Sequence, residues 1–319
     1  MNNMCAICLS LVFGHAAYAD QYSIQGIPSF NFEQVPEFDQ VEIKQNPLNC
    51  EAVVNVDSYD DFLTVASKEP ICAKNNIVID STDIPFPMSA VGELRQGRIM
   101  DFPYCGAVQI SDEFILSAAH CVVDTNHLTY RAEGQDNSIP VDTEIVHPEF
   151  SAVWKAIKQA RENNDEIRHI ALDRLIGATH DLAILRLREK LPMNFEWTIT
   201  EPNNDFNIYR SGSNLESFSH NPYCDYAHQE ITSNFGHFIK EREMVSFARC
   251  SGGPGDSGGP FWAEKDGVAY LFSIVSTGEG EGQEIFPGVY DQTHETYDQI
   301  WGPHPDTIRE FIAPYLNHN

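Results

Sequence analysis

The sequence predicts an all-β fold, an antiparallel barrel or sandwich, for most of the chain. From Ile77 onward, short runs rich in β-branched residues recur, and Gly, Pro or Asn residues separate them. Many short strands joined by turn residues are typical of antiparallel barrels and sandwiches. The runs read NNIVID, CGAVQI, FILSAA, IPVDTEIVH, HDLAILRLR, AYLFSIVSTG and FPGVYDQ. The chain has 319 residues, of which 42% are hydrophobic, enough for one large domain or a two-lobed one.

Two segments depart from this strand pattern and predict helices. Within residues 151–178, apolar residues recur at helical spacing among many charges: Val153, Ile157, Ala160, Ile167, Ala171, Leu175 and Ile176. We expect a surface helical insertion there, before the strand HDLAIL. Asp306 is a suitable N-cap for a second helix, over about 306–317, which we expect to be interrupted near Pro314.

The first residues resemble an export signal. An apolar run from Met4 to Phe13 precedes Ala17-Tyr18-Ala19, the small-x-small pattern of a signal-peptidase site. The run is too short for a membrane span, and no later segment reaches about 18 apolar residues. We therefore expect a signal peptide over residues 1–19, a secreted protein (periplasmic or extracellular) and no membrane association. Residues 20–76 are polar with few periodic runs, which indicates a propeptide or N-terminal extension.

The charge balance excludes some partners. The chain has 20 basic and 47 acidic residues, a formal net charge of −27. Binding to nucleic acid or to an anionic membrane needs basic patches, so neither is expected. We interpret the acidity as support for solubility, and the oligomeric state stays open.

Six cysteines remain after the expected signal, and we treat all six as disulfide candidates. An even number in an oxidising compartment favours disulfides, but six cysteines allow 15 pairings. Cys121 can pair with Cys105, and such a bridge would fix the loop that carries His120. The other candidates are Cys50, Cys72, Cys224 and Cys250. No C-x-x-C pair follows the signal, so no zinc site or other metal is expected.

The stretch CSGGPGDSGGPFW surrounds Ser257 with glycines. A serine hydroxyl becomes a nucleophile only if a base takes its proton and donors stabilise the resulting oxyanion. The glycines allow the backbone to approach a substrate, and the amides of Gly255 and Ser257 can point into one small hole. Asp256 is poorly placed to be the base, and we interpret it as an anchor of the loop. The alternative is a glycine-rich surface turn.

A base and an acid are found upstream. His120 follows a β-rich run in ILSAAHC, and Asp181 begins the apolar run of HDLAILRL. A carboxylate buried at a strand edge needs a donor, and an imidazole N–H is suitable. Taken singly, a structural histidine and a strand-capping aspartate are the simpler interpretations.

Together, LSAAHC, HDLAILRL and GDSGGP, in this order, resemble the chymotrypsin/trypsin-like serine proteases from roughly Ile77 to Trp301. The resemblance implies a peptidase domain over 77–319 with two six-stranded antiparallel β-barrels, at about 77–190 and 191–300. It implies that His120 is the general base, that Asp181 orients it and that Ser257 attacks the scissile carbonyl. The amides of Gly255 and Ser257 would hold the oxyanion, without a cofactor, and the substrate would be a protein or peptide.

The substrate pocket departs from the family. Most relatives have a cysteine four residues before the nucleophile, where this chain has Gly253, and the pocket wall STGEGEGQE has no cysteine either. The family's neighbouring bridge implies that Cys224 pairs with Cys250. Residues implied for substrate binding are Ser251, Ser276, Gly278 and Gly288. An uncharged, open pocket favours an aromatic or large aliphatic residue before the cut, unless a wall glutamate (Glu279, Glu281 or Glu284) reaches a basic one.

Activation raises a further expectation. Relatives are zymogens, in which a freed N-terminal Ile or Val pairs with the Asp before the nucleophile, here Asp256. Ile77-Val78 lies near the expected position, so we hypothesise a propeptide that ends near Lys74–Asn76. The predicted function is thus a secreted serine endopeptidase. The alternative is a catalytically silent binding protein on the same fold; an esterase-type hydrolase is disfavoured because its usual order is Ser–Asp–His.

Overall fold

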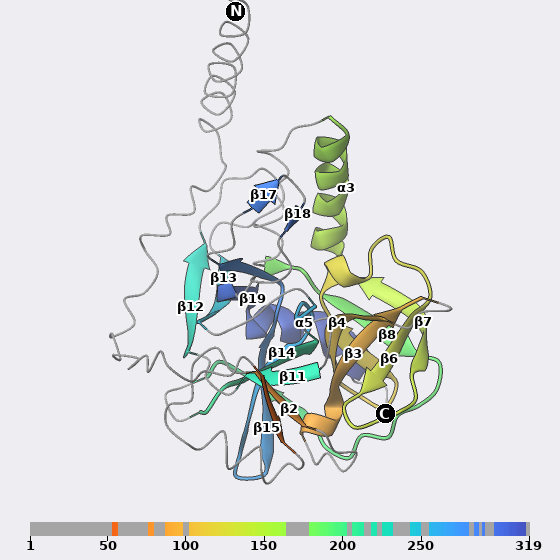
Figure 1. Cartoon of the computed structure of the whole chain (residues 1–319), viewed down its shortest axis with the longest axis vertical. Coiled ribbons are helices and arrows are strands. Elements are labelled where there is room, and N and C mark those ends of the chain that lie inside the picture. Colours follow the sequence, from red (N-terminus) through yellow and green to blue (C-terminus); the bar gives the residue numbers. More distant parts are fainter. Residues whose placement is uncertain are drawn as a thin grey trace, which may run out of the picture.

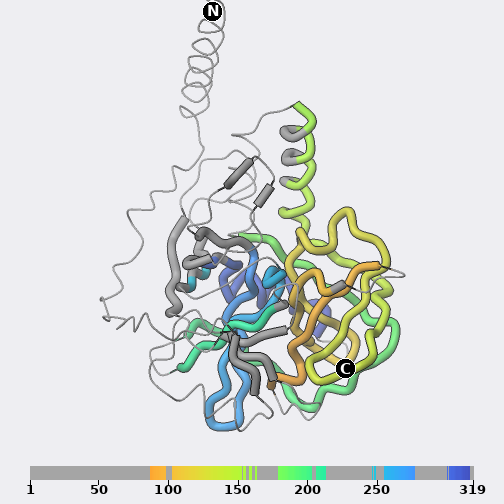
Figure 2. Tube along the Cα trace, in the orientation of Figure 1, coloured from red at the N-terminus to blue at the C-terminus, as the bar shows by residue number. Residues whose placement is uncertain are grey.

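The computed structural model (Figures 1 and 2) describes most of the chain after residue 86 and two short strands before it. The described residues are 53–56, 76–79, 87–97, 102–163, 179–202, 206–213, 218–221, 225–231, 243–249, 255–280, 284–286, 289–290 and 297–316.

Six antiparallel strands close into a barrel. Their order around it is β3 (Val91–Gln96), β4 (Phe102–Gln109), β5 (Phe114–Ser117), β8 (Ala183–Leu187), β7 (Ile139–Val146) and β6 (Leu128–Ala132). Side chains alternate along β6, where Leu128, Tyr130 and Ala132 are buried and the residues between them are not. The predicted six-stranded barrel within 77–190 is therefore confirmed, although it begins only at Val91.

The expected run NNIVID does form a strand, but not in this barrel. It is β2 (Asn76–Ile79), which pairs in parallel with β1 (Val53–Val56) and in antiparallel fashion with β11 (Phe218–Asn221). These strands belong to a seven-stranded sheet that continues through β10 (Tyr209–Ser213), β14 (Pro260–Lys265), β15 (Val268–Ile274) and β9 (Trp197–Ile199). The lower boundary predicted for the first barrel was wrong, because these residues find their hydrogen-bonding partner on β11.

The remaining strands form a four-stranded and a two-stranded sheet. The first has the order β12 (Asp225–Ile231), β13 (Glu243–Arg249), β19 (Tyr297–Pro303) and β16 (Thr277–Gly280); the second pairs β17 (Glu284–Phe286) with β18 (Val289–Tyr290). One hydrophobic cluster joins the four-stranded and seven-stranded sheets, because it contains Ala248 and Ile300 from the former with Phe261 and Phe272 from the latter. No second closed barrel occurs among the described strands, so the barrel expected at 191–300 stays a prediction.

Helices flank the sheets. Two short 3-10 helices, η2 (Met88–Ala90) and η3 (Ala119–Cys121), border the barrel strands. The helix α3 (Pro148–Glu162) projects beside the barrel and buries Phe150 at its base (Figure 1). It covers the first part of the helical insertion expected at 151–178, while residues 164–178 lie outside the described residues.

The C-terminal helix is α5 (Pro305–Leu316), close to the predicted bounds of 306–317. The predicted interruption near Pro314 was wrong, because the helix continues past it to Leu316. Only two helical residues follow this proline, and Tyr315 is held by an edge-to-face contact with Phe114 at 5.9 Å. Among the described residues, no helix is both long and apolar enough to span a membrane.

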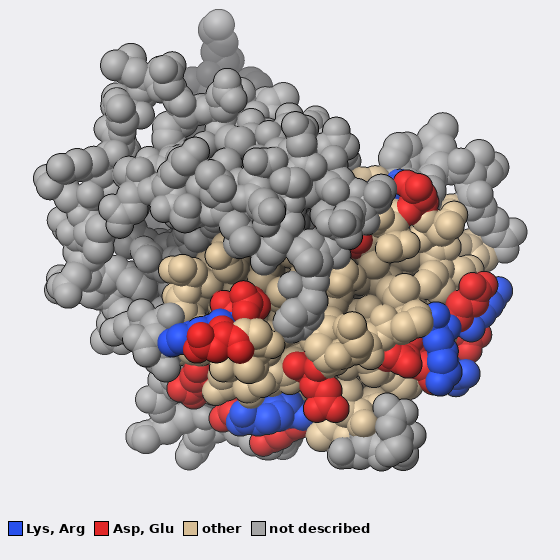
Figure 3. Space-filling view, turned by 90° about the horizontal axis from the view of Figure 1, so that it is seen from below, with Lys and Arg blue, Asp and Glu red and all other residues tan. Residues whose placement is uncertain are grey.

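Charged side chains of both signs are interspersed on the face shown in Figure 3. Acidic and basic groups lie next to one another along its lower and right-hand margins. Among the described residues on this face, no broad basic patch is seen that would suit a polyanion.

Candidate active site

The histidine of LSAAHC is carried by η3, directly after β5. Ala119 and Cys121 on either side of His120 are completely buried and hold the turn against the barrel, while the His120 side chain is 33% exposed. Cys121 forms a disulfide with Cys105 of β4. The predicted bridge is therefore confirmed, and it ties the short helix that bears His120 to the neighbouring strand.

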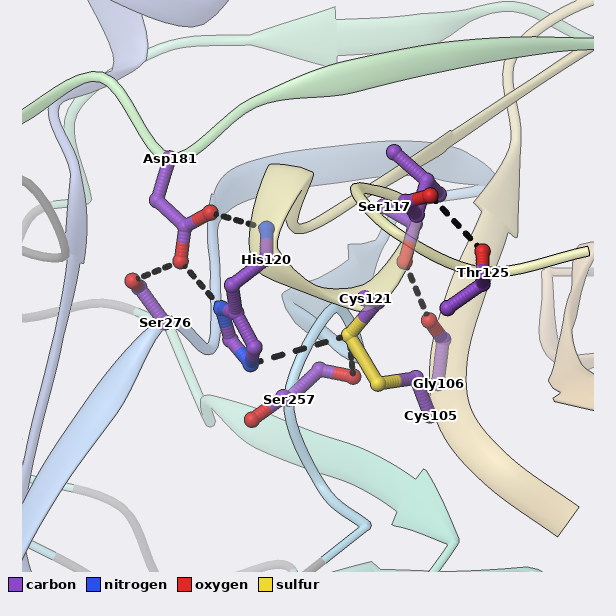
Figure 4. Close-up of a disulfide and its surroundings, with 10 residues drawn as sticks. Cys105, Gly106, Ser117, His120, Cys121, Thr125, Asp181, Ser257 and Ser276 are labelled. Carbon is purple, nitrogen blue, oxygen red and sulfur yellow. Dashed lines mark hydrogen bonds and ion pairs between the residues drawn. A yellow bond between two sulfur atoms is a disulfide. The ribbon is translucent and has the colours of Figure 1, made fainter. Parts of the chain in front are cut away.

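A buried carboxylate orients the imidazole. Asp181 lies just before β8 and is 1% exposed. Its Oδ2 is 2.5 Å from His120 Nδ1, and its Oδ1 accepts a hydrogen bond of 2.8 Å from the backbone N–H of His120. The hydroxyl of Ser276 also donates to Oδ2 (Figure 4). An ionised carboxylate only accepts, so Nδ1 carries the shared proton and Nε2 is left to act on another group.

The loop that carries Ser257 is held by backbone hydrogen bonds on two sides. The amide of Gly106 on β4 donates to the carbonyl of Ser257 at 2.7 Å, and the amide of Gly258 donates to Val275 at 2.6 Å. The amide of Val275 returns a bond to Gly259 at 2.7 Å. The loop is thus fixed between the closed barrel and the segment that follows β15.

Ser257 lies next to the imidazole. Figure 4 shows its side chain on the side of the His120 ring that carries Nε2. The disulfide borders both groups, since Cys121 Sγ is 3.7 Å from His120 Nε2 and 3.7 Å from the carbonyl oxygen of Ser257. The structure therefore brings His120, Asp181 and Ser257 together, although they are 61 and 76 residues apart along the chain.

The two amides predicted to hold an oxyanion lie in this loop. Gly255 has φ +94° and Gly258 has φ +81°. Among the described residues, neither the amide of Gly255 nor that of Ser257 donates a backbone hydrogen bond.

Asp256, between these two amides, turns its carboxylate into the protein. Asp256 Oδ1 is 2.5 Å from Arg210 Nη1, and the two side chains are 2% and 0% exposed. The partner predicted for Asp256 was the amino group of a freed Ile77. In this intact chain, Ile77 lies in β2 opposite Val54, and a cation from β10 holds the carboxylate instead.

Of the other predicted site residues, the structure describes two, Ser276 and Gly278. The hydroxyl of Ser276, predicted to bind substrate, contacts Asp181, and Gly278 lies in β16 opposite Ile300 of β19. The candidates that lie outside the described residues are Ser251, Gly288, Cys50, Cys72, Cys224 and Cys250.

Sequence reasoning missed two contacts: Ser276 with Asp181, and Arg210 with Asp256. Each partner lies in a strand-like run with no motif of its own, in STGEG and NIYRSGS. A local pattern gave no signal for either contact.

His147 and His180 form a pair of neighbouring histidine rings, and His180 directly precedes Asp181 in the sequence. The ring of His147 stacks on His180 with centroids 4.6 Å apart and lies 4.9 Å from the ring of Phe311. Burial lowers the pKa of His147 to about 4, so this ring is neutral at physiological pH.

Two groups of side chains within the described residues have the ligand types of a metal site. One is Cys105, His120 and Cys121, but its sulfurs are bonded to each other and offer no thiolate. The other is Glu201, His304 and Asp306, where His304 Nε2 is already 3.1 Å from Glu201 Oε1.

Comparisons with known proteins agree with this arrangement. The profile of the family described as Trypsin matches residues 79–300, more than half of the chain. Complement factor I from Mus musculus is 25% identical over 229 residues, which cover 61% of this chain and 34% of that protein. Tissue-type plasminogen activator from Bos taurus is 27% identical over 256 residues, which cover 71% of this chain and 43% of that protein. The chain therefore spans about a third to two fifths of the length of these relatives.

Among solved structures, the active form of the Rv3671c protease from M. tuberculosis is similar. It is 14% identical, with a TM-score of 0.44, and the match covers 71% of this chain and 80% of that one.

Proposed function

The chain belongs to the trypsin family, and from that premise we propose that it is a secreted serine endopeptidase in which His120, Asp181 and Ser257 form the catalytic triad. The family supports a peptidase function. The observation that carries the proposal is the buried carboxylate of Asp181, which receives three hydrogen bonds and leaves Nε2 of His120 facing Ser257.

Proton transfer would begin at Nε2. As Ser257 Oγ attacks the carbonyl carbon of the scissile bond, His120 Nε2 takes the hydroxyl proton and becomes an imidazolium. Asp181 stabilises this cation through Nδ1, which is 2.5 Å from Oδ2. Ser276 supports the same oxygen, so the carboxylate keeps its orientation while the ring changes charge.

The tetrahedral intermediate carries a negative oxygen. The amides of Gly255 and Ser257 would stabilise it, because preformed donors aimed at the developing charge need no reorganisation during the reaction. Support comes from the loop, whose carbonyl at Ser257 is fixed by Gly106 at 2.7 Å. This bond fixes the peptide group that follows Ser257 and so limits movement of the loop that carries the two amides.

Two displacements complete the cycle. First, the C–N bond breaks, the amine leaves with the proton from Nε2, and the acyl group stays as an ester on Ser257 Oγ. Next, a water gives a proton to Nε2 and its oxygen attacks the ester. The acid product then leaves, and Oγ recovers its proton. No redox partner or cofactor enters this balance.

The proposal for the other parts of the chain follows the sequence. Residues 1–19 would be removed as a signal peptide, residues 20–76 would be a propeptide or extension, and 77–319 would be the peptidase domain. N-terminal sequencing of the secreted protein tests these boundaries. The pocket residues Ser251 and Gly288 lie outside the described residues, so preference for the residue before the cut is left to a peptide library.

A fluorophosphonate probe tests the catalytic proposal. The full chain should be labelled covalently, and Ser257→Ala should abolish labelling while leaving the thermal unfolding midpoint within a few degrees. Hydrolysis of library peptides should be lost in the same variant. Folded wild-type protein that is labelled neither as the full chain nor after removal of residues 20–76 would reject the proposal in favour of a catalytically silent binding protein.

A further inference from the structure

The buried ion pair between Arg210 and Asp256 is the strongest feature that the proposed mechanism does not use. The guanidinium is 0% exposed and the carboxylate 2%, with Nη1 2.5 Å from Oδ1. Burying two charges is costly, and such a pair is tolerated only where geometry and further hydrogen bonds compensate for the lost hydration. Asp256 directly precedes Ser257, so we ask whether this ion pair serves the function of Ser257.

The strand that carries Arg210 lies directly against the loop of Ser257. A Cβ added to Gly212 on β10 would be 2.3 Å from Asp256 Oδ1. A Cβ on Gly259 would be 1.9 Å from the carbonyl oxygen of Ser211. These contacts leave no room between β10 and the segment from Asp256 to Gly259, so this strand serves as the base on which the loop rests.

Strand β10 is itself held in place. Arg210 is opposite Phe261 of β14 and opposite Asn221 of β11, so it lies in the interior of the seven-stranded sheet. The indole N–H of Trp262 donates to the hydroxyl of Ser211 at 2.7 Å, which joins the strand to the residues that follow the loop. A guanidinium on such a strand is a fixed cation.

Anchoring Asp256 orients both neighbouring peptide groups. Its carbonyl belongs to the peptide group that carries the amide of Ser257, and its own amide belongs to the peptide group that follows Gly255. The anchor therefore fixes one of the two donors proposed for the oxyanion and the residue next to the other. We propose that Arg210 is a positioning residue that holds this loop in its reactive conformation in the intact chain, without a freed amino terminus. This inference rests on the proposed peptidase function.

The position of Ile77 supports the proposal that the loop needs no freed amino terminus. In the intact chain Ile77 is paired with Val54 of β1 and with His220 of β11. In the sheet, β11 lies between β2 and β10, and strands are spaced by about 4.8 Å, which puts β2 roughly 10 Å from β10. The residue predicted to supply the ammonium is thus engaged two strands away, while Asp256 already has a cation.

Substitutions of Arg210 in the full chain test its role in positioning. Arg210→Met should lower kcat for a peptide substrate about 100- to 1,000-fold, the range for loss of an oxyanion donor, with KM changed less than about threefold. Arg210→Lys keeps a cation and should recover at least tenfold of this loss. The control is Arg95→Met, which removes one of the two cations, Arg95 and Arg131, that pair with another buried carboxylate, Glu93. The control should lower the unfolding midpoint but leave kcat within about twofold.

The intact wild-type chain supplies a test that needs no variant. Mass spectrometry would first verify that the bonds between Lys74 and Ile77 are uncleaved, and the fluorophosphonate labelling rate would then be measured before and after cleavage there. We expect rates within about threefold of each other. Labelling that appears only after cleavage would overturn the role of Arg210 while leaving the proposed function intact. Absence of labelling in both forms would instead reject the proposed function, and this inference with it.

For the variants, a kcat loss in Arg210→Met no larger than that in Arg95→Met would overturn the proposal. If Arg210→Met does not fold, the intact-chain measurement decides.

Discussion

Replacement of Gly258 by alanine should destabilise the protein by about 2–5 kcal/mol, because both the backbone conformation and the surrounding space exclude a side chain. Gly258 has φ +81°, a conformation that costs an L-residue about 1–2 kcal/mol. A Cβ there would be 2.1 Å from Ser117 Oγ and 2.4 Å from the carbonyl oxygen of Gly106. Overpacking of this kind costs about a further 1–3 kcal/mol.

Moving the surrounding atoms to make room for this Cβ would itself cost free energy. The hydroxyl of Ser117 already donates to the carbonyl of Gly106 at 2.7 Å, so turning it away would leave a buried acceptor without its donor. The backbone amide of Ala118 would also be 2.9 Å from the new carbon. The clash therefore moves β4, β5 or the loop of Ser257.

Gly267→Ala is the matched control. Gly267 lies in the turn between β14 and β15 with φ +76°, and an added Cβ would meet nothing within 4 Å. Its substitution should cost only the backbone part, about 1–2 kcal/mol. Urea unfolding followed by circular dichroism, with disulfides intact, gives both values. The reasoning fails if the two variants differ by less than about 0.5 kcal/mol, or if Gly258→Ala keeps the wild-type labelling rate.

Three further predictions concern the acid, the histidine pair and α3. Ser276→Ala removes one of three hydrogen bonds to Asp181, so kcat/KM should fall about 10- to 100-fold at an unchanged unfolding midpoint; a change below threefold would contradict it. Burial lowers the pKa of His147 to about 4 against about 6.5 when unfolded, so its contribution to stability is complete above pH 6.5 and is lost as pH falls to 4. His147→Gln should therefore lose about 1–2 kcal/mol less than wild type between pH 7 and pH 4.5 in urea titrations, and equal losses would refute this assignment. In α3, Phe150→Ala should cost about 3–5 kcal/mol because Phe150 is 2% exposed, whereas Lys158→Ala should cost under about 1 kcal/mol; a reversed order in urea unfolding would show that α3 is not held by its buried face.

The strands were predictable where a run has a strong β pattern of its own. FILSAA contains β5 and HDLAILRL contains β8, because uninterrupted apolar residues, Phe114 to Leu116 and Leu182 to Leu185, form the centre of each run. Their partners were not predictable in the same way. NNIVID has an equally clear pattern, yet β2 joins the seven-stranded sheet, since pairing depends on which strand edge is free in three dimensions.

The candidate site was predictable because its residues stand in motifs whose order is itself informative. The motif around His120 also carries Cys121, and the expected bridge to Cys105 is present. Ser276 was assigned to substrate binding from the resemblance of its segment to the family, and its neighbourhood in the sequence gives no sign of its contact with Asp181, which lies 95 residues away. The contact with Asp181 is visible only in the fold, and the role of Ser276 in substrate binding stays a prediction.

For Asp256, too, the need for a partner was predictable from the sequence, but the identity of that partner was not. The loop sequence indicated only that Asp256 anchors the loop, and the resemblance to zymogens implied the amino group of a freed Ile77 as its partner. The sequence alone gave no reason to select one of the chain's 20 basic side chains instead. Arg210 lies between tyrosine and serine in NIYRSGS, a context typical of an exposed strand position, but the packing of β10 against the loop buries it completely. Because the cation is part of the sheet rather than a product of cleavage, the reactive conformation of this loop depends on the integrity of β10.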